Sequence, residues 1–150
     1  MQERFDLSEA LDHATKITEA YHVMLKPLCK ECDLPPLALD VLLFLANHAN
    51  NATANAMCRM RGVKSGIVSV HIDRLVQCGL LERTAVPEDR RKTRLTPTEK
   101  ASDLIEKGRK IQGEFAMALR KGVSAEDAEA WQRVMKTIDE NISEIIEKKG

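Results

Sequence analysis

Hydrophobic residues recur every three or four positions near both ends of the chain, which is the spacing of a helix with one apolar face. The N-terminal stripe comprises Leu7, Leu11, Ala14, Ile17, Tyr21, Met24, Leu28 and Cys32. The C-terminal stripe comprises Trp131, Val134, Ile138, Ile142 and Ile145. Pro27 predicts a kink or a break in the first helix near Lys26. Ser124, three residues before Asp127, predicts the cap of the last helix.

The middle of the chain predicts shorter helices. Residues 37–48 are apolar enough to form a mostly buried helix. Thr53 can cap a further helix that ends at Gly62, and the next helix is expected to begin at Lys64 or Ser65. Two short helices joined by a turn that contains glycine form a helix-turn-helix pattern.

The hydrophobic period changes after these helices. Residues 80–86 and 92–95 have extended character and flank the polar segment 87–91, which predicts a β-hairpin. Thr96 as cap, followed by Pro97 and by Glu99, predicts the start of another helix. The expected fold class is therefore mainly α with a small β-hairpin.

The apolar stripes of the terminal helices have no obvious partner within the chain. They favour a shared helical interface between two copies of the chain, and the alternative is a monomeric helical bundle. We therefore expect a homodimer, in which helices from both ends of the chain take part.

Charge is unevenly distributed along the chain. Its 23 Lys and Arg residues balance its 23 Asp and Glu residues, so the formal net charge is zero. Residues 59–94, however, contain nine positive and four negative side chains. A positive segment that coincides with a helix-turn-helix favours contact with DNA phosphates, and the alternative is an ordinary solvated charged surface.

Several classes of protein are not expected. No apolar run reaches the roughly 18 residues of a membrane-spanning helix. The start, with Gln2, Glu3 and Arg4, lacks the apolar core of a signal peptide, and four cysteines are few for a disulfide scaffold. We therefore expect a cytoplasmic protein. No nucleotide-binding, nucleophile-elbow or zinc-protease motif is found, so neither an enzyme nor a cofactor is expected.

The middle of the chain carries a set of short elements in a fixed order: Asp73-Arg74-Leu75, Gly79-Leu80, Arg83, Asp89-x-Arg91 and Leu95-Thr96. With this set, the middle of the chain resembles the MarR family of bacterial and archaeal regulators. The resemblance implies a homodimeric regulator of transcription that binds a palindromic double-stranded DNA operator. It also implies a repressor whose binding responds to a small molecule, a metal or a redox signal. The implied division is a winged helix-turn-helix DNA-binding region at residues 35–96 and a helical dimerisation region at 1–34 and 97–150.

The resemblance also implies which residues meet DNA. The expected readers of bases are Ser65, Gly66, Ile67, Ser69, Val70 and His71. Phosphate contacts are expected from Lys64 and Arg74, and contacts from the hairpin tip are expected from Arg90 and Arg91. Asp89 is expected to steady the hairpin through an internal ion pair. Val70 stands where the family often has arginine, and Ile67 where it often has a small hydroxyl residue. These apolar residues can contact thymine methyl groups, but they also favour an alternative function, a dimeric protein-interaction module with weak or no specific DNA binding.

Two further candidate sites remain open. An effector pocket is expected near Tyr21, Met24, Leu28, Phe44 and Ile105, for which an ordinary core is the alternative. Cys29 and Cys32 form a C-x-x-C pair that could act as a redox pair or a soft-metal site, or could simply be packed thiols. A structural zinc site needs four ligands and the chain has no second C-x-x-C, so no metal site is predicted.

Overall fold

The computed structural model describes residues 6–149, so that residue 150 and the N-terminal residues 1–5, with Gln2, Glu3 and Arg4, lie outside it. The chain divides into two compact units, Met1–Phe115 and Ala116–Gly150, which are described separately below. This division follows packing. It differs from the predicted division into a DNA-binding and a dimerisation region, which concerns function and stays a prediction. No helix within residues 6–149 is long and apolar enough to cross a membrane.

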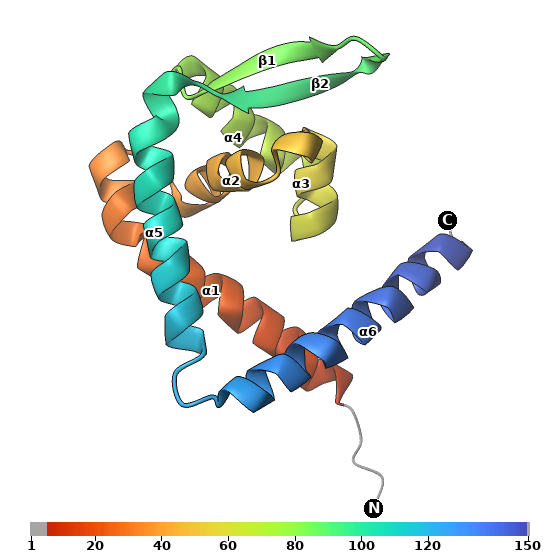
Figure 1. The fold of residues 1–150 in the computed structure, drawn as a ribbon. Helices are drawn as coiled ribbons and strands as arrows, with labels where there is room; N and C mark the ends of the chain where they lie inside the picture. The colour runs from red at the N-terminus through yellow and green to blue at the C-terminus, as the bar shows by residue number, and fades with distance from the viewer. Residues whose placement is uncertain (1–5, 150) are drawn as a thin grey trace, which may run out of the picture. The chain divides into compact units, whose positions relative to one another are not determined.

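The first unit begins with helix α1, Leu7–Cys32 (Figure 1). Oδ1 of Asp6 caps it by accepting hydrogen bonds from the backbone N–H groups of Ser8 and Glu9. The sequence predicted a kink or a break near Lys26, and the break is wrong, because the helix continues through Pro27. Leu25, Leu28 and Cys29 on either side of the proline are buried, and their packing holds the helix together despite the missing backbone N–H.

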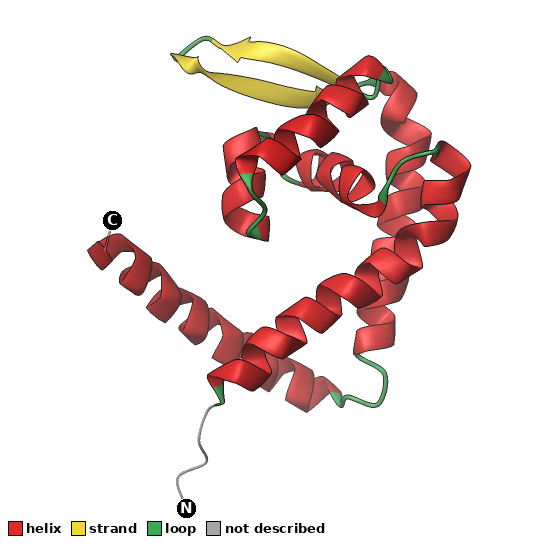
Figure 2. Cartoon of the chain, turned by 180° about the vertical axis from the view of Figure 1, so that it is seen from behind, coloured by secondary structure: helices red, strands yellow, loops and turns green. Residues whose placement is uncertain are grey.

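Helix α2, Pro36–Asn47, is the centre of this unit, with every residue from Ala38 to Leu45 buried. A short 3-10 helix at Ala49–Asn51 follows it. Helices α3, Ala54–Arg61, and α4, Ser65–Gln77, form the predicted helix-turn-helix and pack against each other and against α2 (Figure 2). The predicted cap is confirmed, since Thr53 Oγ1 accepts a hydrogen bond from the Ala56 N–H. Gly62 ends α3 at φ 65°, in the left-handed region that glycine adopts without strain.

The β-hairpin consists of β1, Leu81–Val86, and β2, Asp89–Pro97, paired antiparallel, and it extends away from the helices (Figure 1). The predicted helix cap at Thr96 is wrong, because Thr96 pairs with Glu82 inside the strand ladder. The neighbouring Leu95 is buried and donates its N–H to the carbonyl of Ala52 at 2.8 Å. This tertiary pairing carries the strand beyond the point at which the local capping signal would start a helix.

The chain leaves the hairpin at Thr98 and turns through the 3-10 segment Glu99–Ala101 into helix α5, Ser102–Leu119. Thr98 Oγ1 donates a 2.6 Å hydrogen bond to the carbonyl of Gly79, which ties this turn to the end of α4. The predicted fold class, mainly α with a small β-hairpin, is confirmed.

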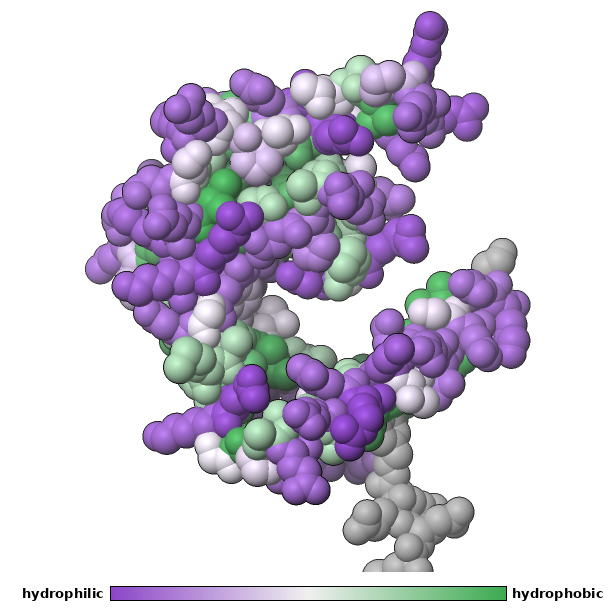
Figure 3. Space-filling model, in the orientation of Figure 1, coloured by the Kyte–Doolittle hydropathy of each residue, from purple (hydrophilic) through white to green (hydrophobic). Residues whose placement is uncertain are grey.

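The second unit contains helix α6, Ala125–Lys149. Its predicted cap is confirmed, since Ser124 Oγ accepts a 3.1 Å hydrogen bond from the Asp127 N–H. No residue of α6 is buried, and apolar atoms reach its surface among polar ones (Figure 3). Large exposed apolar residues of this helix are Trp131, Val134, Met135, Ile142, Ile145 and Ile146.

Candidate nucleic-acid interface

Helix α4 separates its residues into a buried face and an exposed face. Val68, Ile72 and Leu75 are buried against the core. The exposed face carries the predicted base readers Ser65, Gly66, Ile67, Ser69 and Val70. Ile67 is 46% exposed and Val70 is 65% exposed, so two large apolar side chains stand in solvent on this helix. An exposed helix of this kind has the size that the major groove of DNA admits.

Two predicted contact residues differ from this group. His71 is only half-buried, and its pKa lies below the ordinary value because burial, and then the nearby Arg74, disfavour the protonated ring. Arg74 Nη2 donates a 2.8 Å hydrogen bond to the carbonyl of Asp33, just after the end of α1. Part of the Arg74 guanidinium is therefore engaged within the protein. The remaining N–H groups of Arg74 are the ones that could contact a phosphate, and this contact stays a prediction.

The hairpin is joined to α4 by an ion pair that the sequence analysis missed. Arg83 on β1 binds Asp73 on α4 through Nη2 and Oδ1. The signal was present as opposite charges on either side of the Gly79 turn. Asp89, to which the ion pair was assigned, forms none among residues 6–149. Its Oδ1 instead accepts a 3.0 Å hydrogen bond from the backbone N–H of Arg91, because the bend of the strand brings that N–H within reach.

Three basic residues bulge from the outer end of the hairpin. The pairing is regular up to Ala85 opposite Thr93, and the next pair is Val86 opposite Asp89. Arg90, Arg91 and Lys92 therefore have no partner on β1, and all three are exposed. The structure thus places the predicted contacts Arg90 and Arg91 beside a third cation, where their long side chains are free of the ladder.

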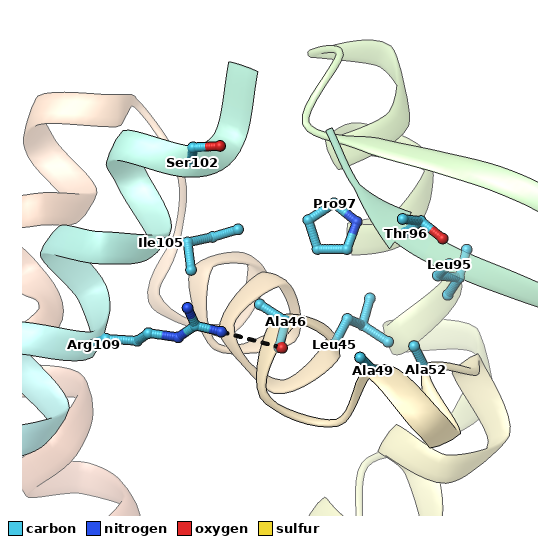
Figure 4. A pocket seen from close by; sticks show the side chains of 10 residues that line it. All are labelled: Leu45, Ala46, Ala49, Ala52, Leu95, Thr96, Pro97, Ser102, Ile105 and Arg109. Atoms are coloured by element: carbon cyan, nitrogen blue, oxygen red, sulfur yellow. Dashed lines mark hydrogen bonds between the residues drawn. The ribbon is translucent and has the colours of Figure 1, made fainter. Parts of the chain in front are cut away.

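The predicted effector pocket is largely core. Leu28, Phe44 and Ile105 are buried and Met24 is half-buried. Only Tyr21 of the five lines the hollow of about 570 Å³ that lies between α1, α2, the turn before α4, and α5. Ile105 instead lines a smaller hollow, of about 310 Å³, whose walls come from α2, the end of β2 and α5 (Figure 4). There Arg109 Nη2 donates to the carbonyl of Ala46 at 3.2 Å.

Cys29 and Cys32 lie on the second half of α1, Cys29 buried and Cys32 half-buried. Burial raises the pKa of both thiols above the ordinary value of 9.0. Thiols of this kind stay protonated at neutral pH and react slowly. Within residues 6–149, no three His, Cys, Asp or Glu side chains are grouped closely enough to hold a metal ion.

A helix-turn-helix with a β-hairpin directly behind its second helix is a winged helix-turn-helix. Residues 33–92 match the model of the MarR family. This match covers the helix-turn-helix and most of the hairpin, and it bears out the resemblance to the MarR family seen in the sequence.

Several regulators of transcription are similar to this chain. Over 104 residues the chain is 28% identical to YdgJ, an uncharacterized HTH-type transcriptional regulator of Bacillus subtilis, covering 69% of this chain and 63% of that protein. A MarR-family regulator from Listeria monocytogenes, solved in complex with a 26mer DNA, is 18% identical with a TM-score of 0.75, covering 98% of this chain and 96% of its own. Another transcriptional regulator of known structure is 26% identical with a TM-score of 0.67, covering 87% of this chain and 97% of its own.

Proposed function

We propose that the chain binds double-stranded DNA by placing α4 in the major groove and the hairpin on the flanking groove or backbone. The observation that carries this proposal is the exposed face of α4 together with three exposed cations on the adjoining hairpin. These cations are Arg90, Arg91 and Lys92, which have no strand partner on β1. Cations that neutralise phosphates supply affinity, and side chains on the helix supply sequence readout. The Listeria regulator of the same fold was solved with DNA, which supports the same use of this surface.

We further propose that the chain acts as a homodimer. In the first unit Leu7, Leu11 and Ile17 of α1 are between 48% and 63% exposed. In the second unit α6 has no buried residue although it carries an apolar stripe. Apolar stripes of this size are usually covered, and a second copy of the chain would cover both. Two copies related by a two-fold axis would read half-sites of a palindromic operator about 34 Å apart.

Repression is the regulatory role that we propose, since a dimer that covers promoter DNA excludes the polymerase. This role places the protein in the cytoplasm and needs no catalytic activity. We propose a small molecule as the signal, bound in the 570 Å³ hollow beside Tyr21. The raised pKa values of Cys29 and Cys32 disfavour the redox and metal alternatives. The competing function, a protein-interaction module without DNA binding, is favoured by the exposed Ile67 and Val70.

The test is fluorescence anisotropy with labelled random-sequence duplexes at several salt concentrations. We expect binding that weakens steeply with salt, and a shallower salt slope for the double variant Arg90→Ala/Arg91→Ala. The matched control, Arg120→Ala/Lys121→Ala, removes two exposed positive charges far along the chain from the helix-turn-helix and should keep the original slope. No binding at low salt would refute the proposal and favour the interaction module. Equal salt slopes for the two double variants would show that Arg90 and Arg91 of the hairpin do not contact DNA phosphates.

A further inference from the structure

The exposed face of α4 presents a pair of apolar side chains to solvent. Ile67 is 46% exposed and Val70 is 65% exposed. Residues three apart on a helix are neighbours on its surface, so these two side chains stand next to each other. The core contacts of α4 come from the opposite face, through Val68, Ile72 and Leu75. The apolar pair is therefore available to a partner that approaches from outside.

The charged residues that follow on this face are engaged within the protein. Asp73 and Arg74 lie three and four positions after Val70, one helical turn further along. Asp73 binds Arg83 on β1. Arg74 Nη2 donates to the carbonyl of Asp33 at 2.8 Å. An arginine reads guanine through two parallel hydrogen bonds, and the bond to Asp33 disfavours that paired contact for Arg74.

The remaining polar side chains of α4 discriminate weakly between bases. The hydroxyl groups of Ser65 and Ser69 are exposed, and a hydroxyl group both donates and accepts hydrogen bonds. Serine therefore contacts several kinds of base edge. His71 is half-buried, so only part of its ring reaches solvent. The apolar pair is thus the part of this face with the sharpest chemical preference.

The first turn of α4 allows close approach to another molecule. Gly66 directly precedes Ile67, and a Cβ atom added there would meet no atom packed against α4 within 4 Å, among the residues that the structure describes. Packing within the chain therefore does not require this glycine, although glycine weakens a helix relative to alanine. The missing side chain lets the backbone come close to a ligand, which brings Ile67 and Val70 toward base edges in a groove.

The group in the major groove that suits an apolar side chain is the methyl group at C5 of a pyrimidine. Thymine carries this methyl group. Cytosine methylated at C5 presents the same group at the same place, whereas uracil and unmodified cytosine carry only a hydrogen there. Three residues advance about 4.5 Å along a helix, and stacked base pairs are about 3.4 Å apart. Two apolar residues at this spacing therefore fit methyl groups on neighbouring base pairs.

We infer that Ile67 and Val70 select DNA half-sites that carry pyrimidine C5-methyl groups on neighbouring base pairs. The inference rests on the proposed function, because it needs α4 in the major groove, and it names the class of DNA sequence that this surface takes. In unmodified DNA the selected half-site contains thymine at both positions. In DNA with methylated cytosine, 5-methylcytosine replaces thymine there better than cytosine does, because the two apolar side chains contact only the methyl group.

The experiment begins with the selection of random duplexes by the full chain and by two variants. We expect the unmodified chain to select thymine at two neighbouring base pairs of each half-site. Val70→Arg should replace one of these thymines by guanine, because an arginine that is free of internal contacts forms the paired hydrogen bonds. Gln77→Arg, the control, adds the same charge at an exposed position about two turns further along α4 and should keep both thymines.

A second measurement isolates the methyl group without changing the protein. One selected thymine–adenine pair is replaced by cytosine–guanine, with and without a methyl group at cytosine C5, and binding is followed by fluorescence anisotropy. We expect the methylated duplex to bind roughly fourfold more tightly than the unmethylated one, the gain for burying one methyl group. Val70→Ala should lose this gain at one of the two positions, and Ile67→Ala at the other. A methyl group on a cytosine outside the half-sites, the DNA control, should leave the affinity unchanged.

The outcomes separate the inference from the proposed function. No binding of any duplex at low salt would refute the proposed function. Selected half-sites without neighbouring thymines, or equal affinity for the methylated and unmethylated duplexes, would overturn the inference and leave the proposed function standing. Retention of both thymines by Val70→Arg would likewise overturn it, because Val70 would then take no part in readout. The comparison of the two duplexes on the unmodified chain decides the matter even if a variant does not fold.

Discussion

Helix α5 approaches α2 closely at Gly108, and this close contact allows the effect of a substitution on the free energy of unfolding to be predicted. A Cβ atom added at Gly108 would lie 2.5 Å from Cδ2 and 2.8 Å from Cδ1 of Leu43. The Leu43 side chain is fully buried, so it cannot move into solvent to make room. Gly108→Ala therefore forces a shift in the core. Gly113 on the same helix is exposed, and a Cβ added there meets no atom of the described residues within 4 Å.

Two opposing contributions set the magnitude. Alanine in place of glycine inside a helix stabilises by about 1 kcal/mol, and this gain applies at both positions. Overpacking a core costs about 1–3 kcal/mol, and this loss applies only at Gly108. We expect Gly113→Ala to raise the free energy of unfolding by about 1 kcal/mol and Gly108→Ala to lower it by up to about 2 kcal/mol. For a chain of this length, each kcal/mol moves the melting temperature by roughly 2–4 °C.

The assay is urea unfolding followed by circular dichroism at one fixed protein concentration, which matters because a dimer is expected. The two variants are compared with each other, since the helical gain then cancels and the difference reports the Leu43 contact alone. A gap of about 1–3 kcal/mol is expected between them. Equal stabilisation of both variants would show that α5 does not pack on α2 at Gly108, and the reasoning would fail.

Three further predictions concern the interface and the hollow. Replacing thymine by uracil in a selected operator should weaken DNA binding by the unmodified chain roughly fourfold per contacted methyl group. The same replacement should leave the DNA affinity of the Val70→Ala variant unchanged. A loss of affinity of equal size in both proteins would show that Val70 does not contact a thymine methyl group. Arg83→Met should lower stability by less than about 1 kcal/mol, because its ion pair with Asp73 is exposed, yet lower DNA affinity by freeing the hairpin; unchanged anisotropy curves would contradict this. Because burial raises the pKa of Asp40 above 3.8, the folded state binds its proton more tightly than the unfolded chain, and the ionised form destabilises folding as pH rises. Asp40→Asn should therefore be more stable than the parent chain at neutral pH, with a gain that shrinks as pH falls toward 3.8, and melting temperatures across that range would show it.

Local sequence signals predicted the helix-turn-helix well, because each signal was satisfied by neighbouring residues. Thr53 caps α3 through an N–H three residues away, and Gly62 ends the same helix by its own backbone conformation. Thr96 shows where such reasoning fails. Its capping box is a good local pattern, but Glu82 on the opposite strand pairs with it, and the adjacent Leu95 is fixed by Ala52. Contacts distant in sequence outweighed the local preference there.

In the candidate interface, too, some features could be predicted from the sequence and others depend on contacts distant in sequence. The resemblance implied that Ile67 and Val70 lie on the DNA-facing side of their helix, and both side chains are exposed in the structure. The surroundings of Arg74 depend on the carbonyl of Asp33, which is 41 residues away, and no local pattern contains that information. The same holds for Asp73, whose partner Arg83 is brought near by the turn at Gly79 and not by helical spacing.

Asp40 is where a sequence signal existed and was missed. It is the only charged residue in the twelve-residue helix α2, which is otherwise among the most buried parts of the chain. Helical periodicity explains apolar residues at such positions, but it gives no reason for a carboxylate, whose burial costs stability. Arg61 at 3.8 Å relieves only one of its oxygens. An isolated charge in an apolar helix therefore argues for a task other than folding. Asp40 lines the same hollow as Nε2 of His22, which has no hydrogen-bond partner among residues 6–149, and this hollow offers such a task.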